Sequence, residues 1–133
     1  MNYTIRRTEF NKIAHFATRA GRERVIIFNP TGAVWFAAFI PNQSGSLPIG
    51  CACCVIKDQK ALFRGIYVEK AYRRKGVFRA LFAEQLKYCK AQGVKELTAN
   101  CTSLSLPEFL AKGFTKEGQY KNNQNITVVR CVI

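Results

Sequence analysis

The sequence changes from an apparent strand to an apparent helix at Tyr72-Arg73-Arg74-Lys75-Gly76-Val77-Phe78-Arg79. The apolar run before this stretch, Ala61 to Val68, is typical of a strand, and the segment from Val77 to Gln92 repeats apolar residues at helical spacing. The first amides of a helix have no acceptor within it, and the helix dipole makes their surroundings positive. Gly76 lets the backbone approach a ligand closely, and four cations surround it. The stretch therefore predicts a site for an anion such as a pyrophosphate.

Two familiar phosphate-binding loops are excluded by spacing. The sequence has neither the G-x-x-x-x-G-K-S/T pattern of a P-loop nor the G-x-G-x-x-G pattern of a dinucleotide site. The alternative to an anion site is a basic helix start that is only solvated.

The stretch resembles the acyl-CoA site of the GCN5-related N-acetyltransferase (GNAT) superfamily. That family carries Gln/Arg-x-x-Gly-x-Gly/Ala between its fourth strand and third helix, usually after V-x-P-x-Y. This sequence matches at Val68, Tyr72, Arg73 and Gly76. It departs at Lys70, where proline is usual, and at Phe78, where glycine or alanine is usual.

A second resemblance lies downstream. The family has a fifth strand and then a short helix that ends in Y-x-K-x-G-F, and Gly113-Phe114 matches the end of that pattern. Aligning on this pair puts Phe109 at the family's tyrosine. The resemblance covers residues 62 to 114, and before residue 48 it rests on element order alone.

The implied fold is a single acyl-CoA N-acyltransferase domain over residues 1–133. The class is α/β (α+β), with a mixed, mostly antiparallel sheet of about six to seven strands. Helices are expected on both faces, and the fourth and fifth strands are expected to splay apart. The local patterns predict strands at Thr4–Arg7, Ala33–Ile40, Ile49–Lys57 and Val94–Cys101. They predict a first helix capped by Thr8 and ended by Gly21, and a short helix at Glu108–Lys112. A loop is expected at Pro41–Pro48 and a closing hairpin around Lys121–Asn125.

The resemblance also implies which residues hold acetyl-CoA, the expected cosubstrate. Backbone groups of Ile66, Tyr67 and Val68 would bind the pantetheine arm as another strand would. The pyrophosphate would lie on the loop and first turn, at Arg73, Arg74, Lys75, Gly76, Val77, Phe78 and Arg79. Asn100 resembles the side chain that binds the pantetheine arm, although a cap at the strand end explains it equally well.

Amide formation from a thioester needs a neutral amine, a donor for the oxyanion and a proton for the leaving thiolate. The resemblance gives the oxyanion to the amide of Val68 and the proton to the tyrosine that Phe109 replaces. A phenyl ring has no proton to give. Three explanations stay open: no acid is needed, CoA is bound without efficient catalysis, or another acid serves, from Tyr67, Tyr120 or Ser103.

The candidate general base is Glu69, which lies close to the expected gap but at a strand end that also suits a solvated side chain. His15, the only histidine, lies beside the apolar face of the first predicted helix, so we expect it to be packed or at the surface. Glu108 begins a short helix, where a capping role accounts for it.

The composition bounds the partners. Twenty-one basic and eight acidic residues give a formal net charge of +13, which favours an acidic acceptor such as nucleic acid or an acidic protein. A basic protein without a single partner explains the charge equally well. No apolar run reaches the ~20 residues that a membrane span needs, and the N-terminus lacks a signal-peptide pattern, so we expect a cytoplasmic protein without membrane contact.

The six cysteines do not predict a metal site. In a strand, Cys51 and Cys53 would share one face and Cys54 the other, which is poor geometry for one ion. We expect reduced thiols in the core.

These patterns together predict an acetyl-CoA-dependent N-acetyltransferase that acts on a primary amine. The alternative is a non-catalytic module of the same fold that binds CoA or a polyanion.

Overall fold

The computed structural model describes residues 2–43, 45–120 and 123–133, and the side chains of Tyr120, Asn123 and Gln124 lie outside that description. Seven strands form one sheet in the order β1-β2-β3-β4-β5-β7-β6. The strands are β1 (Thr4–Thr8), β2 (Ala33–Asn42), β3 (Gly45–Lys57), β4 (Lys60–Val68), β5 (Glu96–Cys101), β6 (Thr115–Tyr120) and β7 (Asn123–Val132). Neighbouring strands are antiparallel except β4 and β5, which are parallel because helix α2 (Val77–Ala91) connects them.

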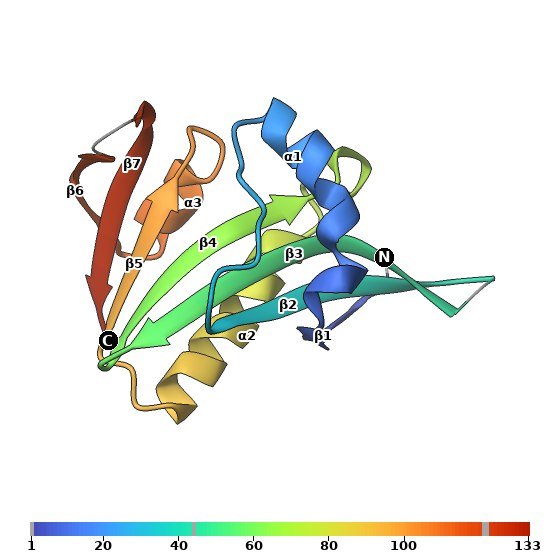
Figure 1. The fold of residues 1–133 in the computed structure, drawn as a ribbon, viewed down its shortest axis with the longest axis horizontal. Coiled ribbons are helices and arrows are strands. Elements are labelled where there is room, and N and C mark those ends of the chain that lie inside the picture. Colours follow the sequence, from blue (N-terminus) through green and yellow to red (C-terminus); the bar gives the residue numbers. More distant parts are fainter. Residues whose placement is uncertain (1, 44, 121–122) are drawn as a thin grey trace.

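Helices cover both faces of the sheet (Figure 1). On one face, α2 and α3 (Leu106–Ala111) enclose the larger core cluster, which includes Phe63, Leu81 and Phe109. On the other face, the 3₁₀ turns η1 (Phe10–Lys12) and η2 (Ala14–Phe16) and helix α1 (Ala17–Arg22) cover a second cluster around Trp35. The predicted fold class is therefore confirmed, and so is the alternation that puts Cys51 and Cys53 opposite Cys54.

Helix α2 follows its sequence pattern closely. It begins after Gly76, and its first turn contains no acidic residue. After its last residue, Ala91, Gly93 takes a φ of +79° and the amide of Val94 donates to the carbonyl of Cys89, as in a Schellman cap.

Two local predictions are wrong. The helix expected from Thr8 is broken into η1, η2 and α1. Thr8 does not cap it, because Thr8 is the last residue of β1 and Glu9 takes the N-cap position of η1 without a side-chain hydrogen bond. The loop expected at Pro41–Pro48 is mostly strand, since Pro41 pairs with Ser46 at the tip of a long hairpin. Pro41 lies beyond Phe39, the last residue of β2 that pairs with β1, so this part of β2 is an edge, where proline is tolerated.

Strand β4 contains a bulge. Cys53 pairs with Arg64 but Cys51 pairs with Tyr67, so β4 has one residue more than β3 between these pairs. Gly65 carries the bulge with φ of +63°, and a Cβ at that position would lie 3.0 Å from the Trp35 ring. The bulge bends β4 away from β5 just after their last paired residues, Phe63 and Ala99.

Candidate active site

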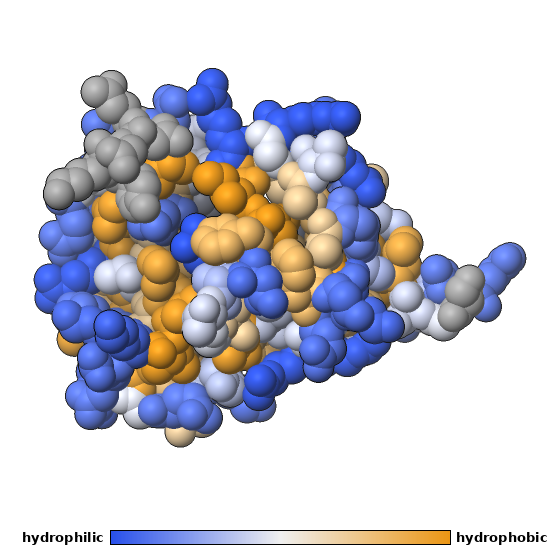
Figure 2. Space-filling view, in the orientation of Figure 1, coloured by the Kyte–Doolittle hydropathy of each residue, from blue (hydrophilic) through white to orange (hydrophobic). Residues whose placement is uncertain are grey.

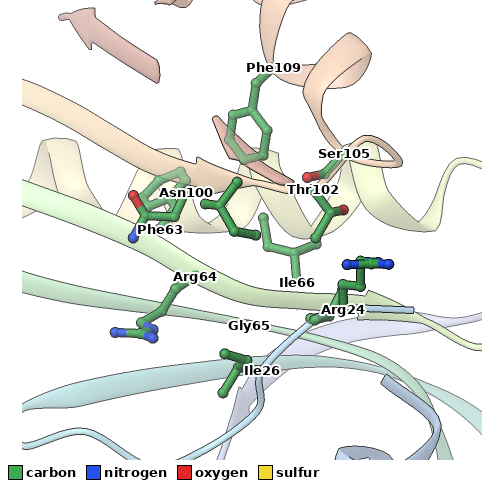
Figure 3. A pocket seen from close by; sticks show the side chains of 12 residues that line it. Arg24, Ile26, Phe63, Arg64, Gly65, Ile66, Asn100, Thr102, Ser105 and Phe109 are labelled. Carbon is green, nitrogen blue, oxygen red and sulfur yellow. The ribbon is translucent and has the colours of Figure 1, made fainter. Parts of the chain in front are cut away.

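A cavity opens where β4 and β5 part. Its volume is about 220 Å³, and we call it the β4–β5 gap. It is lined by Arg24, Val25, Ile26, Phe63, Arg64, Gly65, Ile66, Asn100, Thr102, Ser105, Phe109 and Ile126. Figure 3 shows that the gap runs through the sheet, with Phe109 on the side of α3 and Ile26 and Arg24 on the opposite side.

Backbone groups of β4 face this gap. The amide of Glu69 donates to the carbonyl of Ile49 over 2.8 Å, which makes Gly50 and Val68 a non-hydrogen-bonded pair of the antiparallel ladder. The N–H of Val68 is therefore directed away from β3, toward the gap. Because backbone direction alternates along a strand, Ile66 shares this orientation and Tyr67 faces β3.

The start of α2 presents free donors beside this edge. The first backbone bond of the helix runs from Ala80 to Gly76, so the amides of Val77, Phe78 and Arg79 precede any helical acceptor. Gly76 has φ of +80°, and the nearest atom to a Cβ built on it is the Tyr3 hydroxyl at 3.6 Å. The exposed residues Arg74, Lys75 and Arg79 add positive charge. This arrangement fits a pyrophosphate.

The side chain of Arg73 is engaged in hydrogen bonds within the chain. Its Nε donates to the carbonyl of Val68 over 2.9 Å, and its two terminal nitrogens donate to the carboxylate of Glu23. This hydrogen bonding lowers the pKa of Glu23 and raises the pKa of Arg73. The Arg73 side chain thus ties the motif loop to the end of β4 and to the segment after α1.

Three of the predicted acids and bases, Tyr67, Ser103 and Glu69, are absent from the described lining of the gap. Tyr67 is buried on the α1 face beside Phe16, and desolvation raises the pKa of its hydroxyl. Ser103 is exposed. The carboxylate of Glu69 pairs with Arg19 over 2.7 Å. The side chain of Tyr120 falls outside the described residues.

Of the other predicted residues, Asn100 and Phe109 do line the gap. Phe109 is buried and meets Phe78, Phe82 and Phe114 edge to face, with ring centroids 5.1 to 5.8 Å away. Its ring is therefore a core component as well as a wall of the gap.

Sequence reasoning missed two hydroxyls in the gap, Thr102 and Ser105. Thr102 Oγ1 is buried and has no hydrogen-bond partner within the described part of the chain. A buried hydroxyl without a partner is costly, so it marks a place where a ligand can supply the missing bond.

Ser105 lies near Cys101. Burial raises the pKa of the Cys101 thiol to about 11, and the hydrogen bond from Ser105 opposes that rise. The run Thr102-Ser103-Leu104-Ser105 was the available signal, but only the observed start of α3 shows which hydroxyls turn inward.

Among the described residues, no group of histidine, cysteine, aspartate or glutamate side chains is placed to hold a metal. None of the helices in this described part of the chain is long and apolar enough to cross a membrane.

Residues 3–108 match the model of the acetyltransferase (GNAT) family. No curated protein matches the chain. Solved structures share its fold at low identity. A PaiA N-acetyltransferase from Thermoplasma acidophilum in complex with coenzyme A is 16% identical, with a TM-score of 0.78 and 100% of each chain covered. A GNAT acetyltransferase from Staphylococcus aureus Mu50 is 11% identical, with a TM-score of 0.75 over 98% of this chain and 99% of that one.

A third similar structure is N-acetylglutamate synthase from Neisseria gonorrhoeae, complexed with coenzyme A and N-acetyl-glutamate. It is 14% identical, with a TM-score of 0.76, and the match covers 99% of this chain but 35% of the synthase.

Proposed function

Because this chain belongs to the acetyltransferase (GNAT) family, we propose that it transfers an acetyl group from acetyl-CoA to the nitrogen of an acceptor amine. The observation that carries the proposal is the β4–β5 gap, whose lining includes Asn100 and a buried hydroxyl that has no partner among the described residues. The free amides at the start of α2 supply the separate anion site that the cosubstrate needs. Two of the similar structures contain coenzyme A, which supports the same cosubstrate here.

We assign the cosubstrate to one path across the site. The amides of the loop and first turn, from Arg74 to Arg79, would hold the pyrophosphate. Backbone groups of Ile66 and Val68 would pair with the pantetheine arm, and Asn100 would contact it from β5.

The chemistry is addition followed by elimination. The amine nitrogen forms a bond to the acetyl carbon, the carbon–sulfur bond breaks, and the proton lost by nitrogen ends on the CoA sulfur or in solvent. The N–H of Val68, which points away from β3, would donate to the oxyanion. We propose that Thr102 or Ser105 donates to the leaving sulfur, since both hydroxyls share the gap with Phe109.

The alternative is a non-catalytic module that binds CoA or a polyanion. A second cavity of about 490 Å³ favours the polyanion: Arg6, Arg7 and Lys12 line it, together with the single acid Glu9. This cavity lies at β1, three strands from β4 in the sheet. It therefore offers a docking place for nucleic acid or an acidic protein that is separate from the β4–β5 gap.

Two measurements on one preparation test the proposal. Calorimetric titration with CoA should give saturable heat, and acetyl-CoA with a panel of amines should release free thiol faster than the blank. Binding without release for any amine would favour the non-catalytic module. Absence of CoA binding would refute the site.

A further inference from the structure

The mouth of the β4–β5 gap opposite α3 is positively charged. Arg24 and Arg64 line it, and the described lining contains no aspartate, glutamate or histidine. Figure 3 shows the two arginines on either side of Ile26 and Gly65. A ligand entering from this face therefore meets cations first.

The two carboxylates nearest in the chain to this mouth are already paired. Glu23, beside Arg24, holds the guanidinium of Arg73, and Glu69, at the end of β4, holds that of Arg19. Neither carboxylate lines the gap. An ammonium ion would find no counter-ion among the described residues of the lining.

The wall that bears Arg24 is held in place. This wall, residues 23–32, runs from α1 to β2 and crosses the sheet near β4 (Figure 1). Arg73 anchors its first residue, Ile27 is buried in the α1-side core, and Trp35 Nε1 donates to Asn29 Oδ1 over 3.1 Å. The mouth is thus preorganised rather than formed on binding.

The same wall exposes apolar surface. Ile26 is 66% exposed and Phe28 is 42% exposed, although both flank the buried Ile27. The guanidinium carbon of Arg64 lies 4.3 Å from the centroid of the Phe28 ring, which holds a cation against this apolar edge. Figure 2 shows apolar surface gathered on this face and ringed by hydrophilic residues.

A cationic mouth selects among amines by charge. Cations close to an amine disfavour its ammonium form, so they repel polyamines and lysine side chains but favour the neutral nucleophile. A carboxylate attached to the amine would be attracted to Arg24 or Arg64. Once paired with arginine, that carboxylate would hold the proton on its neighbouring nitrogen less strongly. The arrangement thus replaces part of what a general base would do.

From these observations, and resting on the function proposed above, we infer that the acceptor is an α-amino acid with an apolar side chain. Its carboxylate binds Arg24 or Arg64, its side chain packs on Ile26 and Phe28, and its nitrogen enters the gap. The cavity of about 220 Å³ must also admit the end of the cosubstrate, so it favours a small acceptor whose side chain stays at the mouth.

The test compares acceptors that differ by one charge. Thiol release from acetyl-CoA is measured with leucine and phenylalanine, with their amides, with spermidine, with Nα-acetyl-lysine amide and with a single-stranded oligonucleotide. We expect kcat/KM for the acid to exceed that for its amide by about 10-fold or more, since the amide cannot make a charge-assisted hydrogen bond to arginine.

Three variants assign the effect to the mouth. Arg24→Gln, Arg64→Gln or both should reduce the acid-to-amide ratio toward one while the KM for acetyl-CoA stays within about twofold. Arg22→Gln is the matched control, because Arg22 is exposed and lies outside the lining. It should leave the ratio unchanged.

The result that overturns the inference is CoA binding with no preference for the acid over its amide. Turnover only with spermidine, lysine or the oligonucleotide overturns it too. Absence of turnover with the whole panel, or failure of CoA binding, refutes the proposed function itself, so the two failures are distinguishable.

Discussion

Arg73 and Glu23 lie fifty residues apart in the chain and form a two-pronged ion pair beside the end of β4. The same guanidinium also donates to the carbonyl of Val68. One side chain therefore joins the loop before α2, the strand that lines the gap and the wall on the opposite face. Arg73 thus fixes the positions of these three segments relative to one another.

We expect Glu23→Gln to lower the free energy of unfolding by about 1–2 kcal/mol at neutral pH, because both side chains are less than a third exposed and the pair is bidentate. Chemical denaturation measures this loss. Glu117→Gln is the control, since its pair with Arg130 is about half exposed, and it should change stability by less than about 0.5 kcal/mol. Equal effects of the two variants would contradict the anchoring role of Glu23.

The same pair predicts a pH dependence. Arg73 holds the pKa of Glu23 below its ordinary value of about 4.3, so the contribution of the pair is present above that value. It is lost as the pH falls through the lowered pKa. The stability difference between the native chain and Glu23→Gln should therefore be constant near neutral pH and shrink under acidic conditions. A difference that grew on acidification would have the wrong sign.

Gly76→Asp should weaken CoA binding about 10- to 100-fold, because it places a carboxylate beside the pyrophosphate site. Gly76→Asn is the matched control. Asparagine tolerates the positive φ of this residue and has nearly the same shape, and a Cβ there has room. Calorimetric titration should find the asparagine variant within a few-fold of the native chain. Similar affinities for both variants would show that no anion binds at this loop.

Thr102→Val should lower kcat about 100-fold or more if this hydroxyl protonates the leaving sulfur. It removes a buried hydroxyl that has no partner in the described residues, so thermal stability should not fall. Thr102→Ser keeps the hydroxyl and should keep most of the activity. If valine leaves kcat unchanged, Ser105 becomes the candidate donor.

Gln85→Leu should raise the free energy of unfolding by about 1–2 kcal/mol. Gln85 lies within α2, is fully buried, and neither its Oε1 nor its Nε2 has a partner in the described part of the chain. Leucine removes the cost of desolvating this amide, and its helix propensity is similar. Gln92→Leu, at the exposed end of the same helix, is the control in a thermal melt. A lower melting temperature for Gln85→Leu would show that the amide has a stabilising partner.

The sequence predicted best what depends on local chemistry. Gly76 and Gly93 flank α2, and apolar side chains recur between them at helical spacing. The helix could therefore be predicted without knowledge of the tertiary structure. The prediction of an anion site at the start of α2 rests on the same positions and is the one that the Gly76 variants test. The parallel pairing of β4 and β5 follows from the helix between them.

What the sequence did not reveal depends on where strands bend. The bulge at Gly65 changes the alternation of β4, and this puts Tyr67 on the α1 face. No repeating pattern of residue types in the sequence indicates that Glu69 pairs with Arg19. Nor does any pattern indicate that Arg24 lines the same gap as Arg64, which lies forty residues later in the chain. These contacts arise from chain crossings, and only the folded arrangement displays them.

The close approach of Gly65 to Trp35 has an evolutionary consequence. A Cβ at the bulge would lie 3.0 Å from the indole and its residue would have to adopt a positive φ, so a replacement of Gly65 requires the ring to move. In descendants of this chain, replacements at position 65 should therefore be found more often with a smaller residue at position 35.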